Sequence, residues 1–237
     1  MRAHAVHESD VPSRQTGAVE TRITLDPTRG SERLEQRVVR FGSGRSHRLE
    51  LDGVQGVFFV VSGSGTLEID GARHDLEPDS GAYFRPGEAY TIDNPGPEEL
   101  LTVLVTTWPP EGAIAEPEPR VVRYRDRPSL PAGKDREFRY LVHRDTGSPD
   151  VTQFIGHIPP GRAPTHSHVY DEVIYVLAGH GTLHVEGRSF PIEPGTCMHL
   201  PPLCEHALEN LGDADMRVLG IFHPSGDPAS RAYEANE

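Results

Sequence analysis

The sequence has no long apolar run and very little cysteine. Its uncharged apolar stretches, such as residues 57–61, are far shorter than the roughly 20 residues that a membrane-spanning helix needs. The opening residues MRAHAVHESD carry charges but no apolar segment typical of a secretory signal. Cys197 and Cys204 are the two cysteines, and they do not form a disulfide scaffold. We therefore expect a cytoplasmic protein with reduced thiols and no membrane partner.

Basic residues are scarce relative to acidic ones. The chain has 23 Lys and Arg against 36 Asp and Glu, a formal net charge of −13. A protein of this charge repels phosphate backbones and anionic lipids. The sequence also lacks a basic segment and a helix-turn-helix pattern. We therefore expect no nucleic-acid partner.

Convincing amphipathic helices are missing as well. The 24 glycines and 22 prolines recur between short runs of β-branched and aromatic residues. Two such runs, residues 56–63 and 172–179, have the length of buried strands rather than of helices. The sequence therefore predicts an all-β fold, in which many short antiparallel strands close into two small barrels or sandwiches.

What the chain does contain is an internal repeat. Displaced by 116 residues, QGVFFVVSGSGTLEIDG aligns without a gap with DEVIYVLAGHGTLHVEG. Identical residues continue through the following strands as far as the pair Asn94 and Asn210. A match of this length indicates two copies of one unit, residues 1–118 and 119–237, joined by the Pro- and Glu-rich segment PPEGAIAEPEPR.

Four potential metal ligands gather in the second copy. His166 and His168 are two residues apart in GRAPTHSHVYDEVIYVLAGHG, Glu172 follows, and His206 lies further on in PPLCEHALEN. Residues i and i+2 of a strand point to the same side, so we expect the first two imidazoles to meet. Three imidazole nitrogens and a carboxylate suit Mn, Fe, Co, Ni, Cu or Zn better than Mg or Ca. An octahedral ion held in this way keeps two positions for water, substrate or O₂.

The first copy keeps the strands but loses these residues. A His-x-His pair alone is weak evidence in a chain with 13 histidines, since surface histidines are common. However, none of the four equivalent positions in the first copy keeps the residue of the second copy. A joint change at four separated positions is expected if the four residues bind one ion together. They are Glu50, Asp52, Gly56 and Tyr90. We therefore predict one metal ion in the second copy and a metal-free scaffold in the first, with a hard cation at Glu50 and Asp52 as the alternative.

The second copy resembles a cupin. The first cupin motif is G-(x)5-H-x-H-(x)3,4-E-(x)6-G, and this chain matches it with four rather than five residues before the first histidine. The second cupin motif is G-(x)5-P-x-G-(x)2-H-(x)3-N, and this chain matches it with Leu203 in place of the second glycine. The matching residues are Gly161, His166, His168, Glu172, Gly179, Gly195, Pro201, His206 and Asn210. The resemblance implies two tandem cupin-type jelly-roll barrels, the second with His166, His168, Glu172 and His206 as metal ligands.

Four further residues are candidates for chemistry or substrate binding. His199 would act as a general acid or base if its strand face points to the metal, and Cys197, two residues earlier, would share that face. Tyr170 belongs to the turn before Glu172, and Arg162 is the cation best placed in the sequence for an anionic substrate. For each, an ordinary structural role is the competing interpretation, because strand parity cannot be fixed from the sequence.

The predicted function is that of a metal-dependent enzyme acting on a small oxygenated metabolite. The resemblance favours an Fe-type dioxygenase or other oxidoreductase. It also allows a non-redox isomerase, decarboxylase or lyase, and a cupin that binds a small molecule without turnover. We expect one divalent transition metal per chain, with Fe or Mn favoured over Ni, Cu, Zn or Co. The exposed edge strands of such a fold favour a homodimer.

Overall fold

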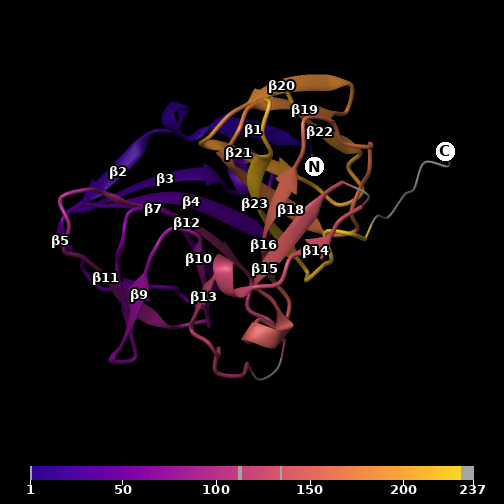
Figure 1. Cartoon of the computed structure of the whole chain (residues 1–237). Helices are drawn as coiled ribbons and strands as arrows, with labels where there is room; N and C mark the ends of the chain where they lie inside the picture. The colour runs from indigo at the N-terminus through magenta and orange to yellow at the C-terminus, as the bar shows by residue number, and fades with distance from the viewer. Residues whose placement is uncertain (1, 112–113, 134, 231–237) are drawn as a thin grey trace.

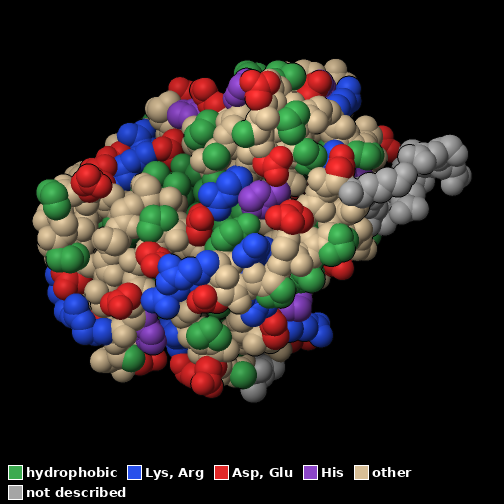
Figure 2. All heavy atoms as spheres, viewed as in Figure 1, with side chains coloured by type: hydrophobic (Ala, Val, Ile, Leu, Met, Phe, Trp, Pro, Cys, Tyr) green, Lys and Arg blue, Asp and Glu red, His purple; other side chains and the backbone are tan. Residues whose placement is uncertain are grey.

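The predicted all-β fold is confirmed by a computed structural model that describes residues 2–111, 114–133 and 135–230. Within these residues the chain forms 23 strands, four short 3₁₀ turns and no α-helix (Figure 1). Correspondingly, none of the described residues belongs to a helix that is long and apolar enough to cross a membrane. Acidic and basic side chains are interspersed over the face shown in Figure 2.

The first half consists of a larger and a smaller sheet. The larger has the order β13-β10-β7-β12-β4-β3-β2, and its strands are β2 (Ser13–Thr16), β3 (Val19–Leu25), β4 (Leu34–Phe41), β7 (Gln55–Ser62), β10 (Ser80–Phe84), β12 (Leu100–Thr107) and β13 (Val121–Arg123). The smaller has the order β5-β11-β8-β9 with β6 also beside β11, and its strands are β5 (Gly44–Arg45), β6 (Leu49–Glu50), β8 (Gly65–Ile69), β9 (Ala72–Leu76) and β11 (Ala89–Asn94).

The second half repeats this plan. Its larger sheet has the order β1-β21-β18-β23-β16-β15-β14, with strands β1 (His4–His7), β14 (Leu130–Pro131), β15 (Glu137–Val142), β16 (Thr152–Ile158), β18 (Asp171–Ala178), β21 (Thr196–Leu200) and β23 (Met216–His223). The smaller has the order β17-β22-β19-β20, with strands β17 (Gly161–Arg162), β19 (Gly181–Val185), β20 (Arg188–Ile192) and β22 (His206–Asn210). Glu186 and Gly187 turn between β19 and β20 with positive φ angles, as tight hairpins require.

The two halves exchange a strand. β1 lies near the amino terminus, yet it lies beside β21 of the second half (Figure 1). In this pair of strands His4 stands opposite His199. The counterpart of β1 in the repeat, β13, pairs with β10 of the first half, with Arg123 opposite Ser80. By sequence, β1 belongs to the first repeat and β13 to the second. In the structure, β1 completes the larger sheet of the second half and β13 completes the larger sheet of the first half.

The described residues form three large apolar cores and one smaller aromatic cluster. One large core fills the first half, one fills the second, and one lies between the two larger sheets. The smaller cluster consists of Phe138, Phe154, Tyr170 and Phe222. In β7, Phe58 packs inside the first half, whereas Val57 and Phe59 pack against the second half. This explains why the central strands read as continuous apolar runs, since both of their faces are buried. In the first half, Tyr90 stands where the repeat places His206, and its ring stacks on Phe84 at 4.6 Å.

Candidate metal centre

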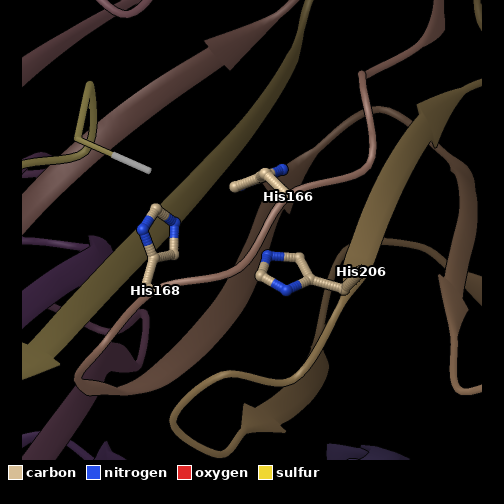
Figure 3. A group of neighbouring side chains, drawn as sticks. All are labelled: His166, His168 and His206. Carbon is tan, nitrogen blue, oxygen red and sulfur yellow. The ribbon is translucent and has the colours of Figure 1, made fainter. Parts of the chain in front are cut away.

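Three histidine side chains of the second half point toward one another (Figure 3). One potential ligand atom from each of His166, His168 and His206 lies within 4.8 Å of the other two. His206 begins β22, but His166 and His168 lie in an irregular segment between β17 and β18, not in the strand that their spacing predicts. Pro164 in this segment has no N–H to donate to a ladder. His166 pairs with β22 through two backbone hydrogen bonds to His206 of 3.0 and 2.9 Å, and the Ala163 N–H donates to the Leu208 carbonyl at 2.8 Å.

Backbone carbonyls fix the tautomer of each histidine. A carbonyl oxygen only accepts hydrogen bonds, so a ring nitrogen beside one must carry the proton. The Nδ1 atoms donate to carbonyl oxygens in three pairs, His166 to Pro164 (3.0 Å), His168 to Ser230 (2.9 Å) and His206 to Cys204 (2.9 Å). Each Nε2 is consequently unprotonated in the neutral ring and is the atom that would coordinate a metal. Histidine ligands in metalloproteins are oriented in the same way.

Glu172, the second residue of β18, adds a carboxylate to this group. Its Oε2 lies 3.6 Å from Nε2 of His206 and 3.9 Å from Nε2 of His168, too far for hydrogen bonds. This oxygen is buried and has no hydrogen-bond partner in the part of the chain that the structure describes. A buried carboxylate oxygen that faces unprotonated nitrogens is explained if a cation belongs between them. The donor set of nitrogen and oxygen fits a divalent transition metal.

Burial shifts the pKa values of this group in opposite directions. Loss of hydration raises the pKa of Glu172 to about 8. Burial, followed by the neighbouring His166 ring, lowers the pKa of His206 to about 3, against a smaller opposite effect of its bond to Cys204. Without a metal, the carboxyl group is therefore largely protonated at neutral pH and the His206 ring is neutral. A metal ion would replace the carboxyl proton.

These shifts predict a pH-dependent stability for the metal-free protein. Between pH 4.5 and 6.5, Glu172 holds a proton in the native state that it releases on unfolding. In the same interval His206 binds a proton on unfolding that it lacks in the native state. The two contributions to the pH dependence of the unfolding free energy therefore cancel. Above pH 6.5 only Glu172 contributes, and stability falls as pH rises toward 8. We expect a loss of about 1 kcal/mol in the free energy of unfolding across this interval, measured by urea titration at both pH values.

The control for this prediction is Glu172→Gln, whose side chain does not titrate. The unfolding free energy of this variant should fall less between pH 6.5 and 8, because the contribution of Glu172 is missing. The other ionisable groups contribute equally in both proteins. Saturating Mn(II) should also remove the contribution of Glu172 from the unsubstituted protein. An identical fall in both proteins without metal would show that Glu172 does not titrate in this range.

A cavity of about 100 Å³ opens beside the four residues. All three histidines and Glu172 line it, and the rest of its lining is largely apolar. The apolar part includes Phe138, Phe154, Ile158, Ile174, Leu208 and Phe222. Arg136 also lines the cavity, although it was not among the residues predicted from the sequence. One signal that could have identified it is its alternation with Phe138, because residues i and i+2 of an extended chain lie on the same side.

A segment after the last strand, residues 224–230, supports the site from the other side. Its Ser230 carbonyl orients His168, and its Asp227 carbonyl accepts a hydrogen bond of 2.8 Å from the hydroxyl of Tyr170. The ring of Tyr170 stacks on that of His168 at 5.2 Å. Tyr170 therefore lies behind His168, and it does not belong to the cavity lining. No sequence motif predicts this role for residues 224–230.

His199 and Cys197 lie on the opposite face of the sheet. In the ladder between β18 and β21 they stand beside Val173 and Tyr175, which alternate with Glu172 and point to the first half. His199 is buried there, with its Nε2 3.0 Å from Oδ1 of Asp171. Burial raises the pKa of the Cys197 thiol to about 12, so this group stays protonated and unreactive. The structure brings neither residue to the cavity.

Arg162 is not at the cavity either. It is exposed in the short strand β17, where its backbone pairs with Glu209 of β22. It does not line the cavity that contains the histidines. Among the described lining residues, the arginine is Arg136 instead.

Comparisons with known proteins agree with this architecture. The family model described as "Cupin domain" matches residues 37–106 and 154–222, one segment in each half. Among curated relatives, the oxalate-binding protein of Thermotoga maritima is 32% identical over 67 residues, which are 27% of this chain and 55% of the relative. An uncharacterized protein of Methanocaldococcus jannaschii is 28% identical over 54 residues, 23% of this chain and 43% of the relative. The chain thus spans about half the length of these relatives.

Solved structures share the fold over nearly the whole chain. Oxalate decarboxylase of Bacillus subtilis, a protein with Mn(II) centers, superposes with a TM-score of 0.77 at 16% identity over 94% of this chain and 78% of that one. Protein Ylba from E. coli has a TM-score of 0.78 at 16% identity over 95% and 92%. The two segments matched by the family model make up more than half of the sequence, and each lies in one of two similarly built halves. The chain therefore belongs to the cupin family and contains two cupin domains in tandem.

Proposed function

We propose that this protein is a metal-dependent enzyme that binds a small oxygenated acid. His166, His168, Glu172 and His206 would hold the ion. The observation that carries the proposal is the convergence of three imidazoles, each with Nδ1 bound to a carbonyl, on a buried carboxylate oxygen without a hydrogen-bond partner among the described residues. A divalent transition metal supplies a Lewis acid at this point, and four protein ligands leave positions for substrate oxygens or O₂.

The first candidate reaction is oxidation of the substrate by O₂ with iron as the metal, the chemistry of a dioxygenase. The apolar lining of the cavity supports it. Phe154, Phe222 and Leu208 surround the ligand side chains with groups that do not bind water. Exclusion of water protects reactive oxygen species from side reactions, and it tunes the redox potential of an ion. In this proposal the chain's own residues bind the ion, shape the cavity and exclude solvent.

A second candidate is non-redox chemistry, such as decarboxylation, isomerisation or elimination, with manganese as the metal. Its support is the shared fold with the oxalate decarboxylase of B. subtilis and its Mn(II) centers. A third, binding of a small anion without turnover, is supported by the similarity to the T. maritima oxalate-binding protein. These likenesses suggest a small anionic ligand in each case.

One experiment separates the three candidates. Protein prepared without metal is loaded with Fe(II) or Mn(II), and oxygen consumption and product formation are followed with catechols, flavonols, diketones and hydroxy-acids. We expect oxygen consumption with Fe(II) and one substrate class, and none with His166→Ala. Turnover without oxygen consumption would favour the second candidate, and saturable binding without turnover the third. Activity retained by His166→Ala after it has lost the metal would contradict the site itself.

The homodimer and the cytoplasmic location expected from the sequence stay predictions. The structural basis for a dimer is that β2 and β14 end the two larger sheets, each with a neighbouring strand on one side. An unpaired sheet edge in a β-rich protein is commonly covered by another chain.

A further inference from the structure

Arg136 is a cation beside the apolar cavity with an unused hydrogen-bond donor. It immediately precedes β15 in a turn closed by a 2.8 Å hydrogen bond from the Ala132 N–H to the Arg136 carbonyl. Its side chain is 15% exposed and lines the same cavity as the histidines. One guanidinium nitrogen, Nη1, donates to Oδ1 of Asp135 at 3.0 Å. Its Nε is buried and has no hydrogen-bond partner within the described ranges.

An anion at Arg136 would satisfy this donor. The pair with Asp135 is weak because the Asp135 side chain is 58% exposed and its charge is screened by water. A buried N–H without an acceptor is costly, and a carboxylate is the acceptor that best fits a guanidinium group. Of the carboxylates that line the cavity, Glu137 is exposed and Glu172 faces the histidines. Neither carboxylate of the cavity lining therefore supplies the acceptor that the Arg136 Nε lacks among the described residues.

A series of aromatic ring contacts leads from β15, which follows Arg136, to the histidines. Phe138, two residues after Arg136, contacts Phe154 with ring centroids 6.1 Å apart, and Phe154 contacts Phe222 at 4.9 Å. Phe222 in turn lies 5.1 Å from the ring of His168. Ile158 and Leu208 also line the cavity. A ligand that reaches both ends of this aromatic wall needs an apolar segment between its polar ends.

We propose that Arg136 binds the carboxylate of a small acid whose apolar chain lies along the Phe138–Phe154–Phe222 wall. The opposite, oxygen-bearing end of this acid faces the histidines. Only this second contact rests on the proposed function; the contact with Arg136 does not require a metal. Oxalate has two carboxylates bonded directly to each other and no apolar segment, so it would leave the wall uncovered. The substrate class is therefore an amphipathic carboxylate rather than oxalate.

The test uses sodium hexanoate and its neutral counterpart hexanamide on the metal-free full chain, with dissociation constants from ligand-observed NMR titrations. We expect hexanoate to bind more tightly than hexanamide and oxalate. Arg136→Gln should weaken hexanoate binding by about tenfold or more and leave hexanamide binding unchanged, because only the charge-assisted bond is lost. Arg136→Lys should retain part of the affinity, since it keeps the charge without the planar fork. The matched control is Arg144→Gln, an exposed arginine in the turn beyond β15.

Several results would overturn the proposal. The protein could bind hexanoate and hexanamide with equal affinity, or it could fail to bind hexanoate. Both Arg136 variants could retain full hexanoate affinity, or Arg162→Gln could lose hexanoate binding in place of the Arg136 variants. Mn(II) affinity is measured separately on the same variants and should not change. Loss of the metal site would therefore be recognised as a failure of the proposed function and not of the Arg136 contact.

Discussion

Replacing His206 with alanine is expected to weaken Mn(II) binding at least about a hundredfold, more than the loss of a residue that only orients a ligand. The His206 side chain is 3% exposed, and its Nε2 is the histidine nitrogen closer to Glu172, 3.6 Å from Oε2. Without this imidazole, the ion would have two histidines and a carboxylate that must still give up its proton. The measurement is a calorimetric titration of metal-free protein with Mn(II), with circular dichroism to verify the fold.

The control is His184→Ala. His184 lies on the neighbouring strand β19, where its Nε2 is 2.7 Å from the carboxylate of Glu209, and it is not part of the histidine group. Its replacement removes an imidazole from the same sheet and should leave Mn(II) affinity unchanged. Equal losses in both variants would indicate a general effect on the fold. Undiminished binding in His206→Ala would remove this residue from the ligand set.

Gly226→Ala is expected to weaken Mn(II) binding by roughly 10- to 100-fold, although this residue is not a ligand. A β-carbon at Gly226 would lie 2.3 Å from the ring of Tyr170. That ring cannot yield easily, because it stacks on His168 and contacts Phe222 at 4.5 Å. Residues 224–230 must therefore move, and the Ser230 carbonyl that orients His168 moves with them.

Calorimetry with Mn(II) again measures this effect, and thermal unfolding of the metal-free protein separates it from a loss of stability. Gly96→Ala is the matched control, since a β-carbon there meets its nearest atom at an ordinary 3.5 Å. Tyr170→Phe, which removes the hydroxyl and its hydrogen bond to Asp227 but keeps the ring, should lose less affinity than Gly226→Ala. Unchanged affinity in Gly226→Ala would show that the segment does not position His168.

The histidine group could be predicted from the sequence because its signal is local and repeated. His166, His168 and Glu172 stand at fixed spacings just before a buried strand, and the other copy of the repeat shows the same strands without them. The convergence with His206 follows once the strands close into a barrel. The left-handed backbone at Leu203, with φ of 63°, occupies the position where the motif has glycine, so the shape of this turn is retained despite the larger side chain.

The rest of the site depends on contacts that the sequence does not encode locally. His199 and Cys197 face the first half because the register of β18 and β21 sets their side, and a shift of one residue would have turned both to the cavity. Arg136 reaches the cavity because β15 lies beside β16. Ser230 orients His168 across 62 residues of sequence. Each of these depends on which strands are neighbours, which periodicity alone does not determine.

The exchange of β1 bears on the order in which the protein can assemble during synthesis. Every strand of the first half's larger sheet, β13 included, precedes residue 124, so this sheet can form while the second half is still being made. β1 leaves the ribosome before every other described strand, but its partner β21 ends at Leu200. At typical translation rates of 5 to 20 residues per second, β1 waits roughly 10 to 40 s for its partner. The sheet that carries Glu172 is thus completed by a strand that was synthesised well before the rest of that sheet.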